Sequence, residues 1–336
     1  MTHAVKSLPI VLKSAALSVV LFFAASPCQG SSPLIKMSIA TGGVNPGTSL
    51  PFIAQKENLF AKHGLDANIV NAPTPAAVQG MLSGTIHALM SFGGPALPTA
   101  TLEGAPPFVL VSSWVSVFPY RIISRRDITN AKDLKGKTGQ IGVPFGTAPH
   151  VALTFGLARL GLDAEKDVKL IQMPKADWGS VLVQLERGDV HFAPFPPPYD
   201  RLAERRGFHS LLSLPEVGIP WTQNGEWVQK SYLTSNRDTV LRLLRVVSDS
   251  MRVFFEEKEK TIAYLSEFLG TNRDDTEYAY QLYLKWAERN PRPRVESVRS
   301  LLEAVRKTTP KAAVADPMSF IDTSLVDELT KAGYFK

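Results

Sequence analysis

From residue 35 onward, short apolar segments alternate with amphipathic ones. Ile35–Ala40 alternates apolar and polar positions, as a half-buried strand does. Residues 76–83 repeat apolar positions at helical spacing and end at Gly84, a residue suited to a left-handed helix stop. From about residue 234 the pattern is almost entirely helical. Strands that alternate with helices predict parallel sheets covered by helices.

The same periodicities give the individual elements. Strands or β-rich segments are predicted at 35–40, 67–70, 85–90, 107–117, 139–143, 168–172 and 190–195. Helices are predicted at 49–62, 76–83, 95–103, from 145–150 to about 160, 177–187, 198–206, 236–256, 259–269, 273–289, 294–308 and 322–333.

Two stretches of the chain look like copies of one another. Ala77–Leu89 and Val181–Ala193 each run through a helical pattern into a glycine, then a β-branched residue and a histidine. Each lies in its own βαβ-like region, which predicts two similar lobes with a cleft between them. The plainer alternative is that glycine followed by Ile or Val is simply common after helices. Since His87 and His191 hold equivalent places without carboxylate neighbours, we expect structural roles rather than metal binding.

The N-terminal region has the pattern of a signal peptide. Two lysines precede the apolar run 15–25, which is short for a membrane span, and small polar residues follow it. We predict a signal peptide at 1–30 and a periplasmic protein. Acylation at Cys28 is an alternative, although Pro27 directly before it fits a lipid-attachment site poorly.

Composition narrows the chemistry. The 336 residues are 44% hydrophobic, which is enough for a large core and predicts two domains. Cys28 is the only cysteine, so the exported chain would hold no disulfide, thiolate metal site or cysteine nucleophile. The net charge of +6 is not gathered into a basic stripe with interleaved aromatics. We predict no metal, no cofactor and no nucleic-acid partner.

Three loops carry the candidate binding chemistry. Thr41–Thr48, Ser91–Gly94 and Phe145–His150 each follow a strand and open a helix, where ligands of open α/β sheets bind. Free N–H groups and the helix dipole favour a negative group there, and these loops lack Asp and Glu, which disfavours a cationic ligand. Glu226 and Asp200 near the second crossover could meet an amine, so zwitterionic ligands stay open.

We therefore predict a small anionic or zwitterionic organic solute as the ligand. The structural alternative is that strand-to-helix turns are rich in glycine anyway, and that aromatic residues are core. The predicted ligand-binding residues are Gly43, Val44, Asn45, Ser91, Phe92, Gly93, Gly146, Thr147 and His150, with Trp178 and Phe195 as aromatic walls and Trp221 as a further candidate wall.

Several motifs, taken in order, resemble one protein family. They are Pro51–Leu65, Gly84–His87, Ala131–Lys137, Gly146–Thr147, Gly188–His191 and Phe320–Leu329. They resemble the periplasmic solute-binding proteins of ABC importers with the type II fold, in the branch serving nitrate, taurine, aliphatic sulfonates and pyrimidine precursors.

The resemblance implies an α/β fold of two lobes. Each lobe is expected to be a mostly parallel sheet flanked by helices, with a helical C-terminal region. Lobe 1 would comprise 34–120 plus 216–336, and lobe 2 would comprise 121–215. Crossovers near 118–122 and 213–222 would act as the hinge. The closed form would dock on a membrane permease, and we expect a monomer without enzymatic activity.

Departures from the family keep other ligands open. His87 and His191 replace the usual Asp, and Pro196 stands where a cleft Trp is expected. A flat heterocycle of pyrimidine type or an aromatic acid is therefore an alternative ligand. An enzyme related to thiamine-pyrimidine synthesis is a second alternative, although its cysteine-rich motif is missing. A sensor that presents its closed form to a receptor is a third.

Overall fold

The computed structural model describes residues 1–4, 33–174 and 177–335. By its contacts the chain divides into Met1–Pro33 and Leu34–Lys336. Residues 1–4 form no helix or strand, and the rest of the predicted signal peptide, Cys28 included, lies outside the described residues. None of the helices in the described part of the chain is long and apolar enough to span a membrane. The second unit is described below.

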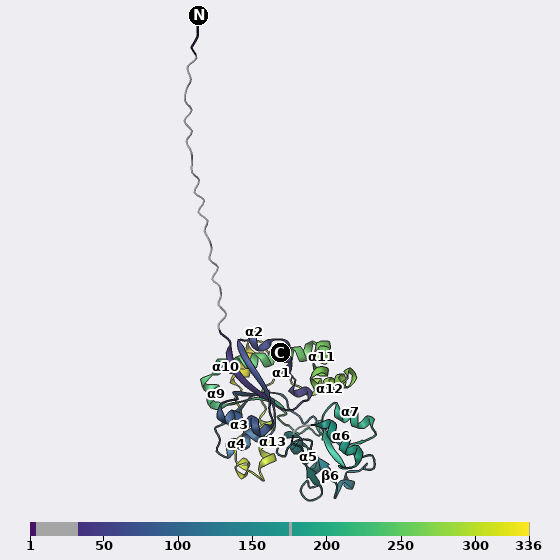
Figure 1. The fold of residues 1–336 in the computed structure, drawn as a ribbon. Helices are drawn as coiled ribbons and strands as arrows, with labels where there is room; N and C mark the ends of the chain where they lie inside the picture. The colour runs from purple at the N-terminus through teal and green to yellow at the C-terminus, as the bar shows by residue number, and fades with distance from the viewer. Residues whose placement is uncertain (5–32, 175–176, 336) are drawn as a thin grey trace. The chain divides into compact units, whose positions relative to one another are not determined.

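The elements of this unit alternate between strands and helices up to Gln229 and are then helical (Figure 1). The strands are β1 Ile35–Thr41, β2 Leu65–Asn71, β3 Ala88–Phe92, β4 Phe108–Val115, β5 Arg121–Ser124, β6 Thr138–Gln140, β7 Lys169–Ile171, β8 Phe192–Phe195, β9 His209–Ser213 and β10 Asn224–Gln229. The α-helices are α1 Leu50–Lys56, α2 Leu59–Lys62, α3 Thr74–Ser83, α4 Ala96–Leu102, α5 Ala148–Arg159, α6 Trp178–Arg187, α7 Tyr199–Arg205, α8 Leu214–Val217, α9 Lys230–Ser235, α10 Arg237–Glu256, α11 Lys258–Leu269, α12 Arg273–Trp286, α13 Val295–Val305 and α14 Ser324–Lys331. Short 3-10 turns are η1 Pro46–Thr48, η2 Ala131–Leu134, η3 Pro310–Ala313 and η4 Pro317–Phe320.

Two five-stranded sheets share one topology. The first has the order β2-β1-β3-β10-β4 and the second β7-β6-β8-β5-β9. In each sheet one strand, β10 or β5, runs antiparallel to both of its neighbours, and the first three strands pair in parallel. The prediction of two mostly parallel α/β lobes is confirmed. We call the part built on the first sheet lobe 1 and the part built on the second lobe 2.

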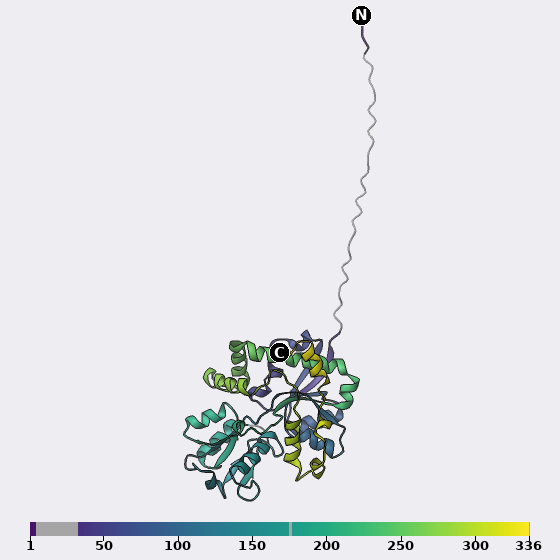
Figure 2. The same ribbon diagram turned by 180° about the vertical axis from the view of Figure 1, so that it is seen from behind.

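Each antiparallel strand directly follows a crossing from one sheet to the other. β5 begins after the segment 116–120, and β10 begins after the segment 218–223. β10 and β5 hold the same position, the fourth, in their respective sheets. Each crossing therefore ends inside a sheet rather than at its edge. Figures 1 and 2 show α5, α6 and α7 gathered around the second sheet, in the teal part of the colour scale.

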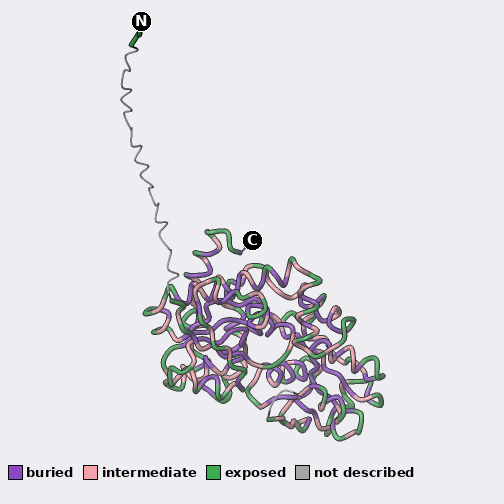
Figure 3. Tube along the Cα trace, turned by 45° about the horizontal axis from the view of Figure 1, so that its top comes forward, coloured by how far each residue is buried: buried purple, intermediate pink, exposed green. Residues whose placement is uncertain are grey.

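The alternation along the strands of lobe 1 builds two apolar layers. Met37 and Ile39 of β1 face the cluster that includes α1 and α10, whereas Ala40 faces the cluster that continues into lobe 2. This is the period-two pattern of a strand covered on both faces. In Figure 3 most of the buried trace lies in the interior, and most of the exposed trace lies at the periphery.

Some predicted elements differ from the structure. The helix predicted at 49–62 is two helices, because Asn58 takes a left-handed backbone conformation with φ 53°. β9 and β10 were not predicted. Both lie in sequence next to proline- and glycine-rich crossings, and β10 (NGEWVQ) begins with Asn and Gly, which disfavour strands in isolation. Their pairing partners are distant in the sequence, so local pattern does not reveal them.

Candidate functional site

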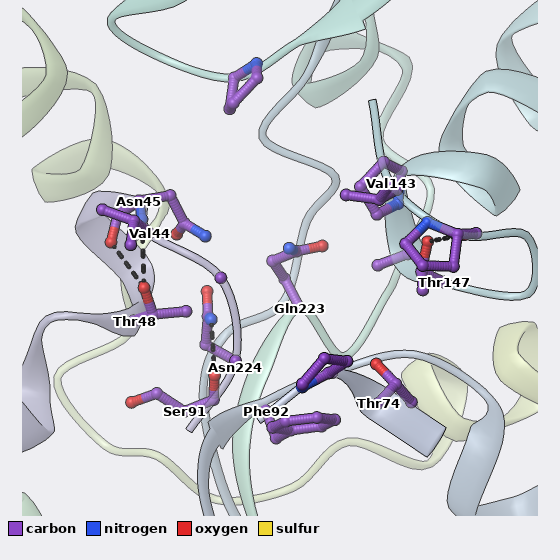
Figure 4. A pocket seen from close by; sticks show the side chains of 18 of the residues that line it. Val44, Asn45, Thr48, Thr74, Ser91, Phe92, Val143, Thr147, Gln223 and Asn224 are labelled. Carbon is purple, nitrogen blue, oxygen red and sulfur yellow. Dashed lines mark hydrogen bonds between the residues drawn. The ribbon is translucent and has the colours of Figure 1, made fainter. Parts of the chain in front are cut away.

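A cavity of about 300 Å³ lies between the ends of the two sheets, with both lobes in its wall. Figure 4 shows it at close range. Lobe 1 and the crossings contribute Gly42, Gly43, Val44, Asn45, Thr48, Asn71, Ala72, Pro73, Thr74, Ser91, Phe92, Gly93, Tyr120, Gln223 and Asn224. Lobe 2 contributes Val143, Pro144, Thr147, Ala148, Pro149, Pro174, Trp178 and Pro196.

The end of β3 is held by two side chains from β10. The Ser91 N–H donates to Glu226 Oε1 over 3.2 Å, and Asn224 Nδ2 donates to the Ser91 carbonyl oxygen over 3.1 Å. Ser91 has φ 56°, a conformation that costs free energy for a residue with a side chain. Both backbone polar groups of Ser91 are thus fixed, and the second crossing is tied directly to the cavity wall.

Gly93 makes a close backbone contact with the second crossing. A Cβ built on Gly93 would lie 2.0 Å from the carbonyl oxygen of Gln223. Its neighbour Gly94 donates its N–H to the Thr222 carbonyl over 3.4 Å. Only glycine fits at residue 93, so the sequence Ser91–Gly94 is built for contact with the crossing strand as well as for its place at the cavity.

The loop after β1 uses its donors internally. Asn45 Oδ1 accepts the Gly47 N–H over 2.9 Å, and Thr48 Oγ1 accepts the Asn45 N–H over 3.1 Å. The buried Tyr283 hydroxyl also donates to Asn45 Oδ1 over 3.1 Å. This reciprocal cap fixes the loop and leaves it with fewer N–H groups for a ligand.

Lobe 2 closes the cavity with an apolar wall. Trp178, at the start of α6, is 7% exposed and lies near Tyr120 and Phe195, with ring centroids 6.4 and 6.1 Å apart. At the start of α5, Thr147 Oγ1 donates to the Pro144 carbonyl over 2.7 Å. The wall therefore offers rings and prolines to a ligand, with few free polar groups.

Glu226 is fully buried just behind the lobe 1 wall. In addition to the Ser91 N–H, it receives a hydrogen bond from the Ser112 hydroxyl. Burial raises the pKa of Glu226 to about 7, against the lowering effect of these two hydrogen bonds. A carboxyl that has a pKa near neutrality and is hydrogen-bonded to a residue of the cavity wall, here Ser91, is a candidate functional group.

The structure brings most of the predicted ligand residues to this cavity. Gly43, Val44, Asn45, Ser91, Phe92, Gly93, Thr147 and Trp178 line it. Whether they contact a ligand stays a prediction.

The remaining predicted residues lie elsewhere. Gly146 and His150 line a neighbouring groove. The Gly146 N–H donates to His150 Nδ1 over 3.1 Å, so these two groups are already paired with each other. Phe195 is fully buried in β8 and is not part of the cavity wall, because its side chain packs into the core of lobe 2. Trp221 is likewise buried and stacks on Phe118 with centroids 4.3 Å apart.

Sequence reasoning missed the contribution of the crossings. Tyr120 ends the first crossing, Gln223 ends the second, and Asn224 is the first residue of β10. Gln223 Nε2 donates to the Tyr120 hydroxyl over 2.9 Å, which joins the two crossings at the cavity. A usable signal was present in the sequence, since Thr222–Glu226 holds four polar side chains at the end of the crossover predicted at 213–222.

A larger groove of about 1190 Å³ adjoins the cavity. The cavity and the groove share Thr74, Pro144 and Thr147. Helices α3, α4 and α13 of lobe 1 form one side of the groove and α5 of lobe 2 forms the other. The groove between these helices therefore borders the cavity directly.

The two histidines do the same structural work in the two lobes. His87 Nδ1 accepts the Ser38 N–H over 2.9 Å, and His191 Nδ1 accepts the Thr138 N–H over 3.3 Å. The backbone N–H of each histidine donates to the carbonyl of the same partner residue. Each histidine thus joins the end of one strand to its parallel neighbour. Across the described residues, no group of three or more His, Cys, Asp or Glu is placed to hold a metal ion.

Comparison with known proteins places these features in context. Residues 45–261 match the model of a family described as NMT1/THI5 like. A protein of Brucella abortus (strain 2308), which carries the provisional name of a binding protein, is 25% identical over 240 residues, covering 69% of this chain and 70% of its own.

Solved structures share the fold at low sequence identity. A protein from Bordetella bronchiseptica RB50 matches with a TM-score of 0.75 and 17% identity, over 89% of this chain and 98% of its own. The periplasmic aliphatic sulphonate binding protein of Escherichia coli matches with a TM-score of 0.67 and 18% identity, over 87% and 93%. A desulfurization enzyme matches with a TM-score of 0.62 and 14% identity, over 89% and 99%.

Proposed function

Because the chain belongs to the NMT1/THI5-like family, we propose that it is the exported solute-binding component of an ABC-type importer. In this role it captures a small organic solute between its two lobes and presents the closed form to a membrane permease. The names of the relatives from Brucella abortus and Escherichia coli, a binding protein and a sulphonate binding protein, support the class of function.

The observation that carries the proposal is the cavity itself. It is walled by both lobes, and the two lobes are joined by two crossings whose ends, Tyr120 and Gln223, lie in its wall. A ligand that contacts both lobes stabilises the arrangement in which they approach, because it makes more contacts there than in an open form. Binding and lobe closure are then one event, and no covalent step is needed.

We propose an anionic or zwitterionic organic solute as the ligand. Its support is the start of α5, where the helix dipole favours a negative group, and the volume of about 300 Å³, which suits a small molecule. The aromatic wall of Phe92 and Trp178 also suits a flat heterocycle or an aromatic acid, which stays the alternative. We further propose that the protein acts as a periplasmic monomer.

A thermal-shift screen of the purified protein tests the function. The panel holds sulfonates, nitrate, carboxylates, pyrimidines and aromatic acids. A solute at about 100 times its Kd adds about 2.7 kcal/mol of stability, which gives a clear rise in Tm. The bound solute is then released by denaturation and identified. A solute recovered unchanged supports the binding role, and a panel without any shift counts against it.

An enzyme on the same fold is the second candidate. The desulfurization enzyme among the structural neighbours, at a TM-score of 0.62, is the observation that favours it. The same experiment separates the two functions. Conversion of the bound solute to a product during incubation would favour the enzyme and contradict the binding role.

A further inference from the structure

The wall of lobe 1 contains hydrogen-bond acceptors that have no donor within the described protein. Gln223 Oε1, Asn224 Oδ1 and the Ser91 hydroxyl are buried without a hydrogen-bond partner among the described residues. For Asn224 the direction is fixed, because its NH2 donates to the Ser91 carbonyl and its oxygen is left over. Figure 4 shows the Gln223 side chain reaching into the cavity above Asn224 and Ser91.

Some backbone donors of the same loops are taken by the protein itself. The N–H groups of Asn45, Gly47, Ser91, Phe145 and Gly146 all donate to side chains of the protein. Proline also removes an N–H from the first turn of η1, α3 and α5. A plain anion has only acceptor atoms, so it cannot satisfy the unpaired acceptors of the lobe 1 wall.

The charged groups near the cavity also favour a cation over an anion. Among the described residues, which exclude 175 and 176, the wall contains no Lys, Arg or His. Glu226 lies directly behind Ser91, where Ser91 from β3 and Ser112 from β4 are the polar groups that meet it. Desolvation raises the pKa of Glu226 and these two hydrogen bonds lower it, and no charged group contributes to the shift. The carboxyl is thus buried without a counter-charge from the described protein.

We propose that the lobe 1 end of the cavity receives a protonated amine of the solute, with Glu226 as the positioning residue that supplies the counter-charge through Ser91. This rests on the proposed function and narrows its ligand. The unpaired oxygens of Gln223 and Asn224 accept the N–H groups of the amine. The rings of Phe92, Tyr120 and Trp178 in the same wall attract a cation over their faces.

The absence of Asp and Glu from the three predicted loops argued against a cationic ligand. That argument counted only the loops, although Glu226 near the second crossover was also predicted as a group that could meet an amine. The carboxyl comes instead from β10, which sequence reasoning did not place beside β3, and pairing of these strands brings Glu226 under Ser91.

The charge coupling has a definite pH dependence. A bound cation stabilises the ionised carboxyl, so it lowers the pKa of Glu226 from its value of about 7 in the free protein. Binding then releases a proton, and affinity for the cation rises with pH through this region. A residue that merely held the Ser91 loop in place would give no such profile.

Calorimetric titration with three probes tests the inference. Benzylammonium, benzyl alcohol and benzenesulfonate share one ring and differ in the charge of the head group. We expect the purified protein to bind benzylammonium best, and more tightly at about pH 8 than at about pH 5. The variant Glu226→Gln keeps the size and hydrogen bonding of the side chain. It is expected to weaken benzylammonium about tenfold at the higher pH and to abolish the pH dependence.

Matched variants keep the result interpretable. Glu267→Gln makes the same charge change on α11, where the side chain is 58% exposed and pairs with Lys56, and it should leave binding unchanged. Gln223→Glu adds a carboxylate at the wall and should tighten benzylammonium several-fold, an effect opposite to that of simple damage. It keeps the test decisive if Glu226→Gln fails to fold.

Three results would overturn the inference. They are tighter binding of benzenesulfonate than of benzylammonium, unchanged affinity and pH profile in Glu226→Gln, and failure of benzylammonium to bind a protein that does bind another solute of the screening panel. The last result leaves the proposed function standing. Failure of every solute in the panel would instead count against the proposed function itself.

Discussion

The two lobes have the same strand order but present different chemistry to the cavity between them. The lobe 1 side carries Ser91, Gln223 and Asn224, with Glu226 behind them, whereas the lobe 2 side is largely proline, valine and Trp178. The shared order, β2-β1-β3-β10-β4 against β7-β6-β8-β5-β9, therefore does not carry the specificity. It fixes where loops meet, and a few substitutions in those loops decide what they bind.

This difference suggests a division of labour. The polar wall of lobe 1 would recognise and orient the solute, and the apolar wall of lobe 2 would cover it and exclude water. Removing water strengthens the electrostatic contacts made on the lobe 1 side, since the local dielectric falls. The following substitutions probe each wall and the contacts that join the lobes.

Truncation of the apolar wall should have the largest effect. Trp178 is 7% exposed and packs near Tyr120 and Phe195, so Trp178→Ala leaves a cavity in lobe 2 as well as a hole in the binding site. We expect a loss of about 3–5 kcal/mol in the free energy of unfolding, measured by chemical denaturation. Trp178→Phe should recover much of it. A loss below about 1 kcal/mol in Trp178→Ala would show that the ring is not packed as described.

The next largest effect is expected from alanine substitution of Gly93, compared with the same substitution of Gly146. Gly93→Ala forces a methyl group against the Gln223 carbonyl, and we expect about 1–3 kcal/mol of destabilisation. The matched change in lobe 2, Gly146→Ala, meets no atom within 4 Å and carries only the cost of its φ of 79°, about 1 kcal/mol. Thermal unfolding of both variants checks this order. An equal loss of stability in the two variants would contradict the close backbone contact between the Ser91–Gly94 segment and the second crossing.

The contact between α7 and α12 links the lobes directly. Figures 1 and 2 show these helices side by side, and the Tyr278 hydroxyl donates to the buried Asp200 carboxylate over 2.8 Å. Arg205 Nη1 donates to Asp275 Oδ1 over 2.6 Å in the same place. Tyr278→Phe removes one donor from a buried acid and should cost about 1–2 kcal/mol by denaturant unfolding.

The Asp200 pair also gives a control through pH. Burial raises the pKa of Asp200 to about 6 from 3.8. A raised folded pKa means that the stability contributed by this group is fully present below the unfolded value and is lost as pH rises through about 6. Asp200→Asn should flatten this part of the stability profile. An unchanged profile in the variant would show that another group is responsible.

The smallest difference is expected between the two histidines. His87→Ala and His191→Ala each leave a backbone N–H without its acceptor, at a cost of about 1 kcal/mol or somewhat more. The effect should be larger for His87, whose bond is 2.9 Å against 3.3 Å and whose ring also lies 5.4 Å from that of Tyr232. Melting temperatures of the two variants decide the order. His87→Asp, with an acceptor on a shorter side chain, is the rescue variant.

Much of this architecture is legible in local sequence patterns. The two helix-to-glycine segments end at Gly84 and Gly188, both left-handed with φ 75° and 85°, as the repeat predicted. The alternation of Ile35–Ala40 likewise predicted a strand, although this strand, β1, is covered on both faces rather than half-buried. These features depend on residues close together in the chain.

The contacts of the site that the sequence did not predict depend on distant pairing. Glu226 and Ser91 are separated by 135 positions, and their contact exists because β10 pairs antiparallel to β3. No periodicity in either segment encodes that pairing. Phe195 illustrates the opposite error. The pattern placed an aromatic residue at the end of a strand near the cleft, but alternation turns its side chain into the core.

Hydrogen–deuterium exchange with and without the solute that gives the largest thermal shift tests the central claim most directly, because it locates the bound solute without assuming which atoms it touches. The account predicts that protection increases together in 91–94 and 222–226 of lobe 1 and in 143–149 of lobe 2. Protection confined to one lobe, or gathered away from these segments, would contradict binding in the cavity between the lobes.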